Sequence, residues 1–454
     1  MKDIIKKIIV WKLGIIAKMY LRRYKPQIVA VTGNVGKTST KEAIAVVLNK
    51  IKRVRSGKGN LNNEFGVPLT IVGNWADDYY EAGNTFWFWI RVLVVSFFGL
   101  IFQKNYPEIL VLEYGADKPG DIKKLSKKYK PHIGVVTAVG EIPVHVEYFS
   151  GPEGVAREKG KLVEVLSASD FAVLNFDDLA VLEMKEKTKA KILTYGFGDG
   201  ANIKISNFQF LISTEIPRLK HGEPYPSNER PEGVSFKMNY NDTLHGGGQG
   251  FVPFKLNGSL GKSQGYAAAA AAAVGSIFSM NLVDISEALS EYHGQKGRLK
   301  ILKGIKNSTI IDDTYNASPL STHLALETLR DLPGTRRVAV LGDMLELGKY
   351  TIDAHREAGN MVGSFVDLLI CVGSRAKFIA DSAFNQMPAG NIHKFETSDE
   401  AKLKVKELIN EGDLVLVKGS QGMRMEKIVE EIMAEPEKKK ELLVRQSKKW
   451  LKQP

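Results

Sequence analysis

The segment that most constrains this chain is a glycine-containing turn between an apolar run and a helix-prone stretch, within residues 28–48. The apolar run, residues 28–31, is typical of a buried β-strand, and residues 41–48 are typical of a helix. Glycines allow such a turn to direct its backbone N–H groups onto an anion, and the helix N-terminus adds partial positive charge. Lys37 is expected to contact the outer phosphates of a nucleotide, and the Thr38 hydroxyl to bind magnesium. The predicted phosphate-binding residues are Gly33, Asn34, Val35, Gly36, Lys37, Thr38 and Ser39.

The motif is shorter than the general P-loop pattern, which has a glycine five residues before its Gly-Lys pair. Val31 stands at that position, and the chain has Thr-Gly-x-x-Gly-Lys-Thr over residues 32–38. This spacing indicates a nucleotide triphosphate site of a particular subfamily. An ordinary strand-to-helix turn is the competing interpretation, and the Gly-Lys-Thr sequence in this context disfavours it.

The positive charge of the chain is concentrated at its two ends. Of a net charge of +12 over 454 residues, residues 1–25 contribute +7 and residues 437–454 contribute +5. The body between them is therefore neutral, whereas a nucleic-acid enzyme spreads basic residues along a binding face. We predict no nucleic-acid partner. The single cysteine, Cys371, lies in an apolar run, which excludes an internal disulfide and predicts a small core residue.

Two segments are unusually apolar. Residues 1–25 are predicted to form a basic amphipathic helix whose apolar stripe consists of Ile4, Ile8, Trp11, Ile15 and Met19. This stripe either lies on an anionic membrane or packs on the body of the protein, and packing is favoured. Residues 86–102 are at the short limit for a membrane span, so we predict a buried or interfacial helix packed against residues 4–20.

The order of the predicted elements indicates an α/β protein with two domains. Strands alternate with helices, a pattern typical of a mostly parallel, doubly wound sheet that binds ligands at the strand C-termini. The predicted strands are residues 28–31, 53–55, 109–112, 133–137, 171–175, 309–311, 337–341, 368–372 and 414–417. The predicted divisions are the N-terminal helix (1–25), a P-loop central domain (26–295) with a β-rich insertion (201–256), a second, Rossmann-like α/β domain (296–435) and a basic helical tail (436–454).

Three further side chains of the first domain suit metal binding or catalysis. Glu113 ends a predicted strand, and His145 and Lys159 lie beyond the next strand. A carboxylate at a strand end beside a P-loop suits magnesium, which prefers oxygen ligands and bound phosphates. Taken alone, His145 is more typical of a structural or surface histidine, and Lys159 of a solvated helix residue.

Four longer motifs, together with these residues, resemble the Mur ligase family, whose members form amide bonds with ATP in peptidoglycan precursor synthesis. The resemblance covers residues 26–435 and is strongest to the MurF branch, which adds D-alanyl-D-alanine to a UDP-N-acetylmuramoyl-tripeptide. The motifs are residues 60–68 (NLNNEFGVP), 312–319 (DDTYNASP), 342–348 (GDMLELG) and 417–420 (VKGS).

The resemblance implies a reaction through an acyl phosphate. ATP phosphorylates a carboxylate, and the amino group of the incoming dipeptide then attacks it and releases phosphate. Thr38 and Glu113 are expected to hold one Mg²⁺, and Glu113 and His145 a second. A carbamylated lysine is expected to help hold the second ion, and it falls on Lys159. Lys161 stands two residues further on, and the spacing from His145 selects Lys159.

The resemblance also assigns residues to the nucleotide and to the acceptor. The second domain is expected to close over the nucleotide through a hinge at residues 294–298. Arg298, Asp313 and Asn316 are expected to contact the nucleotide, and Lys418 is expected to face the reacting centre. The acceptor is expected to contact Asn60, Asn62 and Asn63.

Two departures from the family pattern affect what is bound. Family members carry His-Asn and a further Asn before the poly-alanine helix, where this chain has residues 261–267 (GKSQGYA). We therefore expect the amide of Gln264 to read adenine. MurF-like enzymes also have a uridine-binding domain before the P-loop, whereas only about 27 residues precede the loop here. The uridine end of the acceptor is expected to bind elsewhere, to bind weakly or to be absent.

The favoured function is therefore that of a MurF-type ligase, with ATP and two Mg²⁺ ions as the expected cofactors. Its expected substrates are UDP-N-acetylmuramoyl-tripeptide and D-alanyl-D-alanine. The second hypothesis is a Mur-ligase-like amide synthetase with a different acceptor, lipid-linked or non-muramoyl. A non-catalytic scaffold is disfavoured by the intact set of reactive residues. We expect a cytoplasmic monomer, with peripheral membrane contact through residues 1–25 and 86–102 as a further hypothesis.

Overall fold

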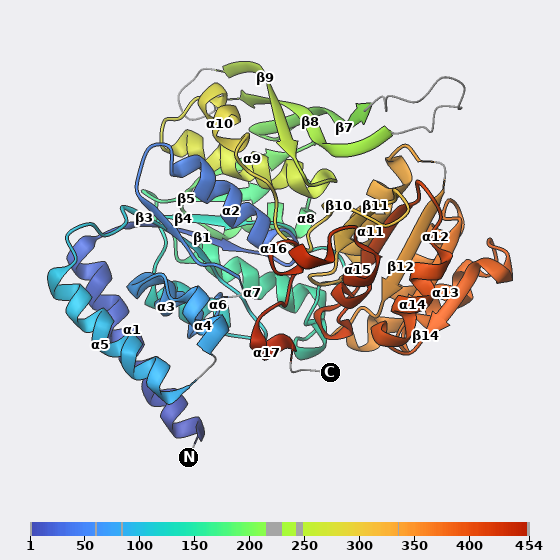
Figure 1. Cartoon of the computed structure of the whole chain (residues 1–454). Coiled ribbons are helices and arrows are strands. Elements are labelled where there is room, and N and C mark those ends of the chain that lie inside the picture. The colour runs from blue at the N-terminus through green and yellow to red at the C-terminus, as the bar shows by residue number, and fades with distance from the viewer. Residues whose placement is uncertain are drawn as a thin grey trace.

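Two β-sheets, one for each half of the chain, organise the protein (Figure 1). The computed structural model describes residues 2–59, 61–82, 85–214, 229–241, 248–334 and 336–451. The first sheet has nine strands and is complete before the chain enters the second, which has six. The two sheets therefore form consecutive α/β domains, as the alternation of strands and helices in the sequence predicts.

The first sheet carries the phosphate loop, residues 33–39, after the third strand in its spatial order. Its strands are β1 (Gln27–Thr32), β2 (Val54–Ser56), β3 (Ile109–Glu113), β4 (Ile133–Val136), β5 (Phe171–Asn175), β6 (Lys191–Gly196), β7 (Ile203–Thr214), β8 (Glu229–Asn241) and β9 (Gly248–Asn257). They lie in the order β2-β3-β1-β4-β5-β6-β7-β8-β9, parallel as far as β7 and antiparallel beyond it. The predicted β-rich insertion is thus a continuation of this sheet.

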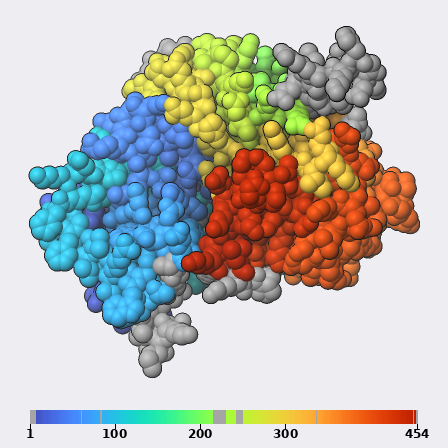
Figure 2. All heavy atoms as spheres, in the orientation of Figure 1, coloured from blue at the N-terminus to red at the C-terminus, as the bar shows by residue number. Residues whose placement is uncertain are grey.

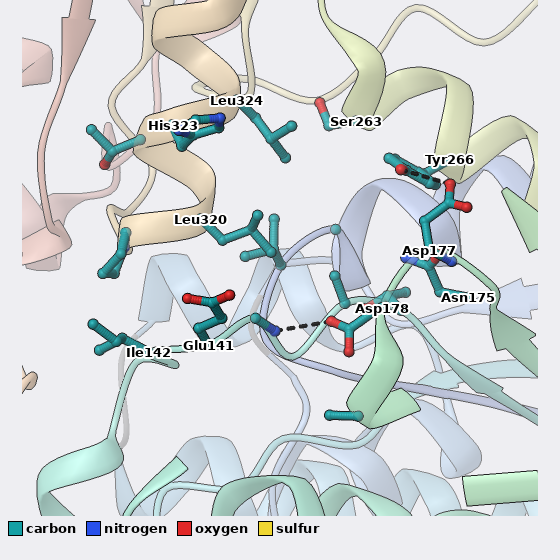
Figure 3. Close-up of a pocket in the computed structure, with 18 of the residues that line it drawn as sticks. Glu141, Ile142, Asn175, Asp177, Asp178, Ser263, Tyr266, Leu320, His323 and Leu324 are labelled. Carbon is teal, nitrogen blue, oxygen red and sulfur yellow. Dashed lines mark hydrogen bonds between the residues drawn. The ribbon is translucent and has the colours of Figure 1, made fainter. Parts of the chain in front are cut away.

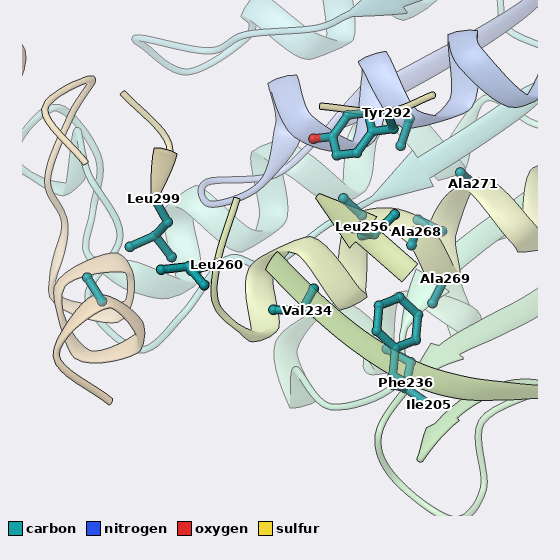
Figure 4. Packing of buried hydrophobic residues seen from close by; sticks show 14 of the residues in the cluster. Ile205, Val234, Phe236, Leu256, Leu260, Ala268, Ala269, Ala271, Tyr292 and Leu299 are labelled. Atoms are coloured by element: carbon teal, nitrogen blue, oxygen red, sulfur yellow. The ribbon is translucent and has the colours of Figure 1, made fainter. Parts of the chain in front are cut away.

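Helices cover both faces of the first sheet. They are α1 (Lys2–Tyr24), α2 (Lys37–Leu48), α3 (Gly66–Val72), α4 (Ala76–Ala82), α5 (Phe86–Phe102), α6 (Asp121–Lys128), α7 (Pro152–Glu164), α8 (Leu179–Leu182), α9 (Lys262–Ile277) and α10 (Leu282–Leu289), with 3₁₀ turns η1 (Val146–Tyr148) and η2 (Glu183–Lys187). Successive residues of β1 enter two different cores, because side chains of a strand alternate between the faces. Val29 and Val31 pack with α2 and α9, whereas Ile28 and Ala30 pack with α1, α3 and α5–α7. The alanines of α9 are buried, and their small side chains let the helix lie close to α2, β6 and β7. Ala268, Ala269 and Ala271 belong to the same core as Ile205 of β7 and Phe236 of β8 (Figure 4).

The second sheet is built from strands β10 (Lys300–Lys303), β11 (Thr309–Asp313), β12 (Arg337–Gly342), β13 (Leu368–Val372), β14 (Ile392–Phe395) and β15 (Leu414–Lys418). Their order is β10-β11-β15-β12-β13-β14, and the described pairs are parallel except for β10–β11. Cys371 is buried in β13, as its apolar context predicts. The helices of this half are α11 (Pro319–Asp331), α12 (Thr351–Gly363), α13 (Lys377–Ala383), α14 (Ser398–Leu408) and α15 (Glu426–Ile432), with η3 (Gly348–Tyr350), η4 (Ala389–Asn391) and η5 (Gln421–Met423).

The N-terminal helix α1 lies beside α5 at the edge of the first domain, so the predicted pairing of these apolar segments is confirmed (Figure 1). The preference for packing the predicted stripe on the body is wrong, because Ile8, Trp11, Ile15 and Met19 face outward. A second stripe of α1 packs inward instead: Ile9, Leu13, Ala17 and Tyr20. Within the described residues, we find no helix with the length and apolar character needed to cross a membrane.

The C-terminal tail is a series of short helical pieces and not one continuous helix. They are η6 (Pro436–Lys438), α16 (Lys439–Leu442) and α17 (Lys448–Leu451). Between the last two, Leu443 and Arg445 are buried against the second domain. Because α17 also contacts α4, the tail joins both domains.

Candidate active site

The phosphate loop leaves β1 and enters α2 through two glycines at positive φ. Gly33 has φ 138° and Gly36 has φ 88°. A Cβ at Gly33 would lie 2.0 Å from Thr137 Oγ1, so the loop has room only for glycine there. Among the described residues, Asn34 Nδ2 is a buried donor without a protein partner. A loop with such a free donor and a helix N-terminus fits a phosphate group.

Glu113 ends β3 beside this loop, because β1 and β3 are parallel neighbours with Val31 opposite Glu113. Thr38 Oγ1 donates to Glu113 Oε2 at 3.0 Å, and Asn62 Nδ2 donates to Glu113 Oε1 at 3.0 Å. Burial alone would raise the pKa of Glu113, but the cations of Lys41 and Lys37 hold it below its usual range. The ionised carboxylate and the hydroxyl are hard oxygen ligands, which fit a magnesium ion that also binds phosphates.

Lys159 lies in the same electrostatic cluster. Its side chain is buried, and burial together with the charge of Lys37 lowers its pKa to about 7. Asp117 and Glu113 act on it in the opposite direction. At neutral pH much of this lysine is therefore the uncharged amine, which is the form that reacts with carbon dioxide to give a carbamate. The site thus fits a carbamylated lysine.

His145 reaches this cluster through Asp117. Its Nε2 lies 3.8 Å from Asp117 Oδ1, and its Nδ1 lies 2.7 Å from Glu346 Oε2 of the second domain. Both His145 and Glu346 have positive φ, 68° and 64°. In the part of the chain that the structure describes, no three His, Cys, Asp or Glu side chains form a ready metal cage. Magnesium commonly completes its shell with substrate phosphates and water, and the role of His145 as a ligand stays a prediction.

The second domain contains a buried ion pair between Lys418 and Asp313. Lys418 Nζ donates to Asp313 Oδ2 at 2.6 Å and to the carbonyl of Asn316 at 3.0 Å. Burial lowers the pKa of Lys418, whereas Asp313 raises it. Burial also lowers the pKa of Lys37, and the charge of Arg298 lowers the pKa of both lysines further. Of the predicted nucleotide residues of the second domain, Arg298 therefore acts both on the phosphate loop and on the Lys418–Asp313 pair.

Arg298 is positioned by aromatic and backbone groups that the sequence motifs do not reveal. Its guanidinium lies 4.0 Å from the centre of the Tyr315 ring. From the C-terminal tail, Arg445 Nη2 donates to the carbonyls of Thr314 and Tyr315, at 2.9 and 2.5 Å. Arg445 Nη1 also pairs with Glu426 at 2.8 Å. The tail thus fixes the segment on which Arg298 stacks.

A cavity of about 700 Å³ continues from the phosphate loop between the two domains (Figure 3). Gly36 and Thr137 line it near the loop, and Leu320 and His323 of α11 line it from the second domain. Its size and its apolar walls with a few polar groups fit a nucleoside. The polar groups that line it include Glu141, Asn175, Asp177, Asp178, Ser263 and Tyr266.

Two carboxylates after β5 are held in place at this cavity. Asp178 Oδ2 accepts from the backbone N–H groups of Val139 and Gly140 at 2.8 and 2.9 Å. Asp177 Oδ2 accepts from the Tyr266 hydroxyl at 2.9 Å (Figure 3). Neither carboxylate is among the predicted site residues. The signal in the sequence is their position directly after a predicted strand, since ligands bind at strand C-termini.

The expectation that Gln264 reads adenine does not agree with its contacts. Gln264 is buried, its Nε2 donates to the Arg298 carbonyl at 3.3 Å, and its Oε1 accepts from the Tyr292 hydroxyl at 3.1 Å. Both ends of the amide are therefore used inside the protein. On the same helix, the neighbouring Ser263 and Tyr266, two residues further on, line the cavity instead.

The motif at residues 60–68, which carries the predicted acceptor contacts and is here called the acceptor loop, meets Glu113 through Asn62. Asn62 bonds this carboxylate directly, whereas Asn63 Oδ1 accepts from the N–H groups of Phe65 and Gly66 at 3.1 and 3.0 Å. Asn63 therefore shapes the turn into α3. Asn60, the third predicted acceptor contact, lies outside the described residues.

Comparisons with known proteins agree with this geometry. A family model described as "Mur ligase middle domain" matches residues 95–221, and one described as "Mur ligase, glutamate ligase domain" matches residues 297–421. A Bacillus subtilis (strain 168) protein named "UDP-N-acetylmuramoyl-tripeptide--D-alanyl-D-alanine ligase" is 29% identical over 423 residues, which cover 93% of this chain and 79% of that protein. The protein of the same name from Escherichia coli (strain K12) is 26% identical over 419 residues, 92% of this chain and 79% of that protein.

Solved structures show the same fold. The MurF ligase of Thermotoga maritima in complex with ADP superposes with a TM-score of 0.71 at 24% identity, over 95% of this chain and 84% of that chain. A MurF structure from Acinetobacter baumannii gives a TM-score of 0.71 at 24% identity, over 92% of this chain and 79% of that chain. At these identities the likeness establishes the fold alone.

Proposed function

The chain belongs to the Mur ligase family of ATP-dependent amide ligases, and we propose that it adds D-alanyl-D-alanine to a UDP-N-acetylmuramoyl-tripeptide. The observation that carries the proposal is the contact of Glu113 with both Thr38 and Asn62. Through this one carboxylate, the phosphate loop and the predicted acceptor loop meet at a single point. That is the geometry required to pass a phosphoryl group from ATP to an acceptor carboxylate.

The reaction begins with the acceptor carboxylate attacking the outer phosphate of ATP to give an acyl phosphate and ADP. Lys37 neutralises negative charge on the transferring group, and the loop N–H groups hold the remaining phosphates in place. Thr38 and Glu113 would hold magnesium, which supplies further neutralisation of phosphate charge when bound. The amino group of the dipeptide then attacks the acyl carbon, and phosphate leaves as the amide bond forms.

The second domain supplies cations and excludes water from the acyl phosphate. The charge of Arg298 acts on Lys37 of the phosphate loop and on Lys418, and Asp313 holds the Lys418 ammonium in one position. An acyl phosphate hydrolyses readily in water, so a site assembled between two domains protects it. Residues 294–298 contain Gly294 and Gly297 at positive φ, and they form the proposed hinge.

Lys159 is proposed to act as a carbamate. Addition of carbon dioxide to its neutral amine, with loss of a proton from the nitrogen, would give an anion that can help to hold a second magnesium ion. The lowered pKa of about 7 supports this role, because the neutral amine is the reactive form. His145 and Glu113 are the proposed companions of the carbamate.

An enzyme with a different acceptor is the second candidate. The helix α5 packs against the acceptor loop, where the Phe65 and Trp89 rings lie 5.9 Å apart. This contact joins an apolar helix to the acceptor loop, and it is the observation that favours a lipid-linked or otherwise non-muramoyl acceptor.

The proposed location is the cytoplasm, where ATP is available to the enzyme. The proposed oligomeric state is a monomer. It is supported by Thr38 of the phosphate loop and Asn62 of the acceptor loop, which come from a single chain and both contact Glu113.

The test of the function is formation of ADP, phosphate and the pentapeptide product from ATP, Mg²⁺, UDP-N-acetylmuramoyl-tripeptide and D-alanyl-D-alanine. We expect phosphate release only when both the acceptor and the dipeptide are present. Turnover of the same enzyme with another acceptor, and none with the muramoyl tripeptide, would move the assignment to the second candidate. Phosphate release that needs no acceptor would contradict both.

A further inference from the structure

The helices α1 and α5 each have two apolar stripes, and only one stripe of each is used by the fold. On α5 the inward stripe is spaced by four residues, through Phe88, Val92, Ser96 and Leu100. The outward side chains are also apolar: Phe86, Trp87, Val94, Val95, Phe97, Phe98, Ile101 and Phe102. A helix that is apolar on nearly all sides is typical of a buried position, yet this one, with Arg91 as its one charged residue, lies at the edge of the molecule (Figures 1 and 2).

The outward stripes of the two helices form one continuous surface, which we call the α1–α5 face. It consists of the outward residues of α5 together with Ile8, Trp11, Ile15 and Met19 of α1. A groove between the helices is lined from both sides, by Ile15 and Met19 and by Val94, Phe97 and Phe98. Trp87 is 75% exposed and Phe102 is 72% exposed. Contiguous apolar surface of this kind marks an interaction site.

The α1–α5 face is held rigidly by polar anchors on its inner side. The Tyr20 hydroxyl donates to the Ser96 carbonyl at 2.8 Å, and the Tyr24 hydroxyl donates to the Gln103 carbonyl at 2.7 Å. Tyr24 also stacks on Tyr106, their ring centres 4.5 Å apart. The outward stripes therefore cannot turn inward without breaking these contacts.

The charge around the α1–α5 face is mostly of one sign. Exposed cations lie along α1 between its apolar side chains, and residues 7–25 contain no acidic residue. On α5, Arg91 is exposed and pairs with Asp78 at 3.5 Å. A protein partner with an apolar face would not by itself require this surrounding charge. The exposed cations of α1 and its C-terminal end are Lys7, Lys12, Lys18, Arg22, Arg23 and Lys25.

We propose that the α1–α5 face docks on the surface of an anionic lipid bilayer. Tryptophan and phenylalanine side chains enter the boundary between headgroups and acyl chains, and the lysines and arginines contact the anionic headgroups. α5 has 17 residues, at the short limit for a span, so the pair lies in the interface and does not cross it. Charge complementarity favours this occupant over a second copy of the chain, whose own α1 would bring like charges together.

The contacts of α5 give the docked protein a defined orientation. Trp89, on the inner side of α5, lies against Phe65 of the acceptor loop, and the second domain lies at the opposite end of the molecule (Figure 1). The bilayer would therefore adjoin the acceptor side of the first domain. This inference is independent of the proposed reaction, because it rests on the surface of α1 and α5 alone.

The experiment is co-sedimentation of the full-length protein with vesicles of phosphatidylcholine alone or mixed with phosphatidylglycerol, at low and high salt. We expect binding to the mixed vesicles at low salt, weaker binding at high salt, and little binding to phosphatidylcholine. The triple variant W87S/F98S/F102S should bind at least about tenfold more weakly, because each side chain loses its apolar contact with lipid. The control is F384S, which removes a phenylalanine of the second domain whose exposed fraction (60%) lies between those of Phe98 (52%) and Phe102 (72%), and it should bind as the wild type does.

A second measurement distinguishes docking from a folding defect. Brominated acyl chains should quench the fluorescence of the wild type and leave that of W11F/W87F nearly unchanged, while both proteins unfold at the same temperature. Absence of wild-type binding to anionic vesicles at low salt would overturn the proposal, as would undiminished binding of the triple variant. A dimer in solution that the triple variant abolishes, without any vesicle binding, would assign the face to a second copy and also overturn it.

Discussion

The two ends of the nucleotide site are built in different ways. At the phosphate end, Lys37 and Thr38 are consecutive in the chain, and Glu113 comes from the neighbouring strand. At the other end, the cavity wall combines Asp177 after β5, Tyr266 of α9 and His323 of α11. One end is therefore a local motif supported by a single strand pairing, and the other is assembled from segments far apart in the sequence.

This difference shows that the contacts at the phosphate end are required by the chemistry of the ligand, whereas those at the cavity end depend on how this particular chain folds. Any phosphate bound at a strand-to-helix turn needs glycines, a cation and a helix N-terminus in a fixed order. A nucleoside can be enclosed by many combinations of apolar walls and polar groups. We therefore expect substitutions at the phosphate end to reduce the chemical step strongly, and substitutions at the cavity end to change mainly the affinity for ATP.

The largest effect is expected for Lys37→Ala. Loss of this cation removes charge stabilisation where the phosphoryl group is transferred, and kcat should fall by about a thousandfold. The measurement is phosphate release with saturating ATP, acceptor and dipeptide.

The matched control for this substitution is Lys58→Ala, which changes an exposed lysine whose partner is Asp77 at 2.6 Å. It should leave kcat unchanged, since surface ion pairs contribute little. A Lys37→Ala enzyme that keeps wild-type turnover would contradict the proposed difference between the two ends of the site, because phosphoryl transfer would then not occur at the phosphate end.

A smaller loss, about a hundredfold in kcat, is expected for Lys159→Ala, whereas Lys159→Glu should recover part of it. Glutamate supplies a carboxylate without carbon dioxide, so only a carbamate role predicts this order of activities. Burial lowers the pKa of Lys159 to about 7, and the neutral amine is the reactive form. At constant dissolved carbon dioxide, stimulation of the wild type should therefore increase as pH rises through about 7.

Lys161→Ala is the control for the position of the carbamate. Lys161 lies two residues along α7, and its Nζ pairs with Glu164 at 2.8 Å. The variant should keep the activity of the wild type and the same response to carbon dioxide. Equal losses for Lys161→Ala and Lys159→Ala would contradict the assignment.

About a tenfold loss of kcat/KM is expected for Arg445→Lys, which tests whether the tail supports the phosphate end. Lysine keeps the charge but has a single nitrogen in place of the planar fork with which Arg445 spans Glu426 and the carbonyls of Thr314 and Tyr315. The Tyr315 ring under Arg298 should then lose its fixed position. Steady-state kinetics with ATP varied would measure the loss.

Arg336→Lys is the control for the tail substitution. Arg336 Nη1 likewise pairs with a carboxylate, Asp413 at 2.6 Å, and donates to a carbonyl, that of Leu408 at 3.2 Å. These contacts lie at the start of β15, whereas Lys418 lies at its end. An Arg445→Lys enzyme with the same kcat/KM as Arg336→Lys would limit the tail to a structural role.

The sequence predicts most strands and the phosphate end because each depends on short-range patterns. The apolar run of β1, the glycine turn and Glu113 at a strand end all follow from neighbours in the chain. The sequence does not predict that Arg445 supports Tyr315 from 130 residues away, or that the tail joins both domains. The sequence also predicts the wrong inward stripe for α1, because Leu13 and Ile15 are equally apolar and only the packing against α3 and α5 separates them.

The smallest effects are expected at the cavity end, where two residues of α9 give opposite readouts. Tyr266→Phe removes the hydroxyl that donates to Asp177, so KM for ATP should rise by about fivefold while kcat is retained. Gln264→Leu leaves the Arg298 carbonyl and the Tyr292 hydroxyl without their partner, which should lower the free energy of unfolding by about 1–3 kcal/mol. Thermal unfolding and ATP titration of both variants separate the two roles. If Gln264→Leu instead raised KM for ATP at unchanged stability, the amide would be reading the base after all, and the cavity end would be as predictable from the motif as the phosphate end.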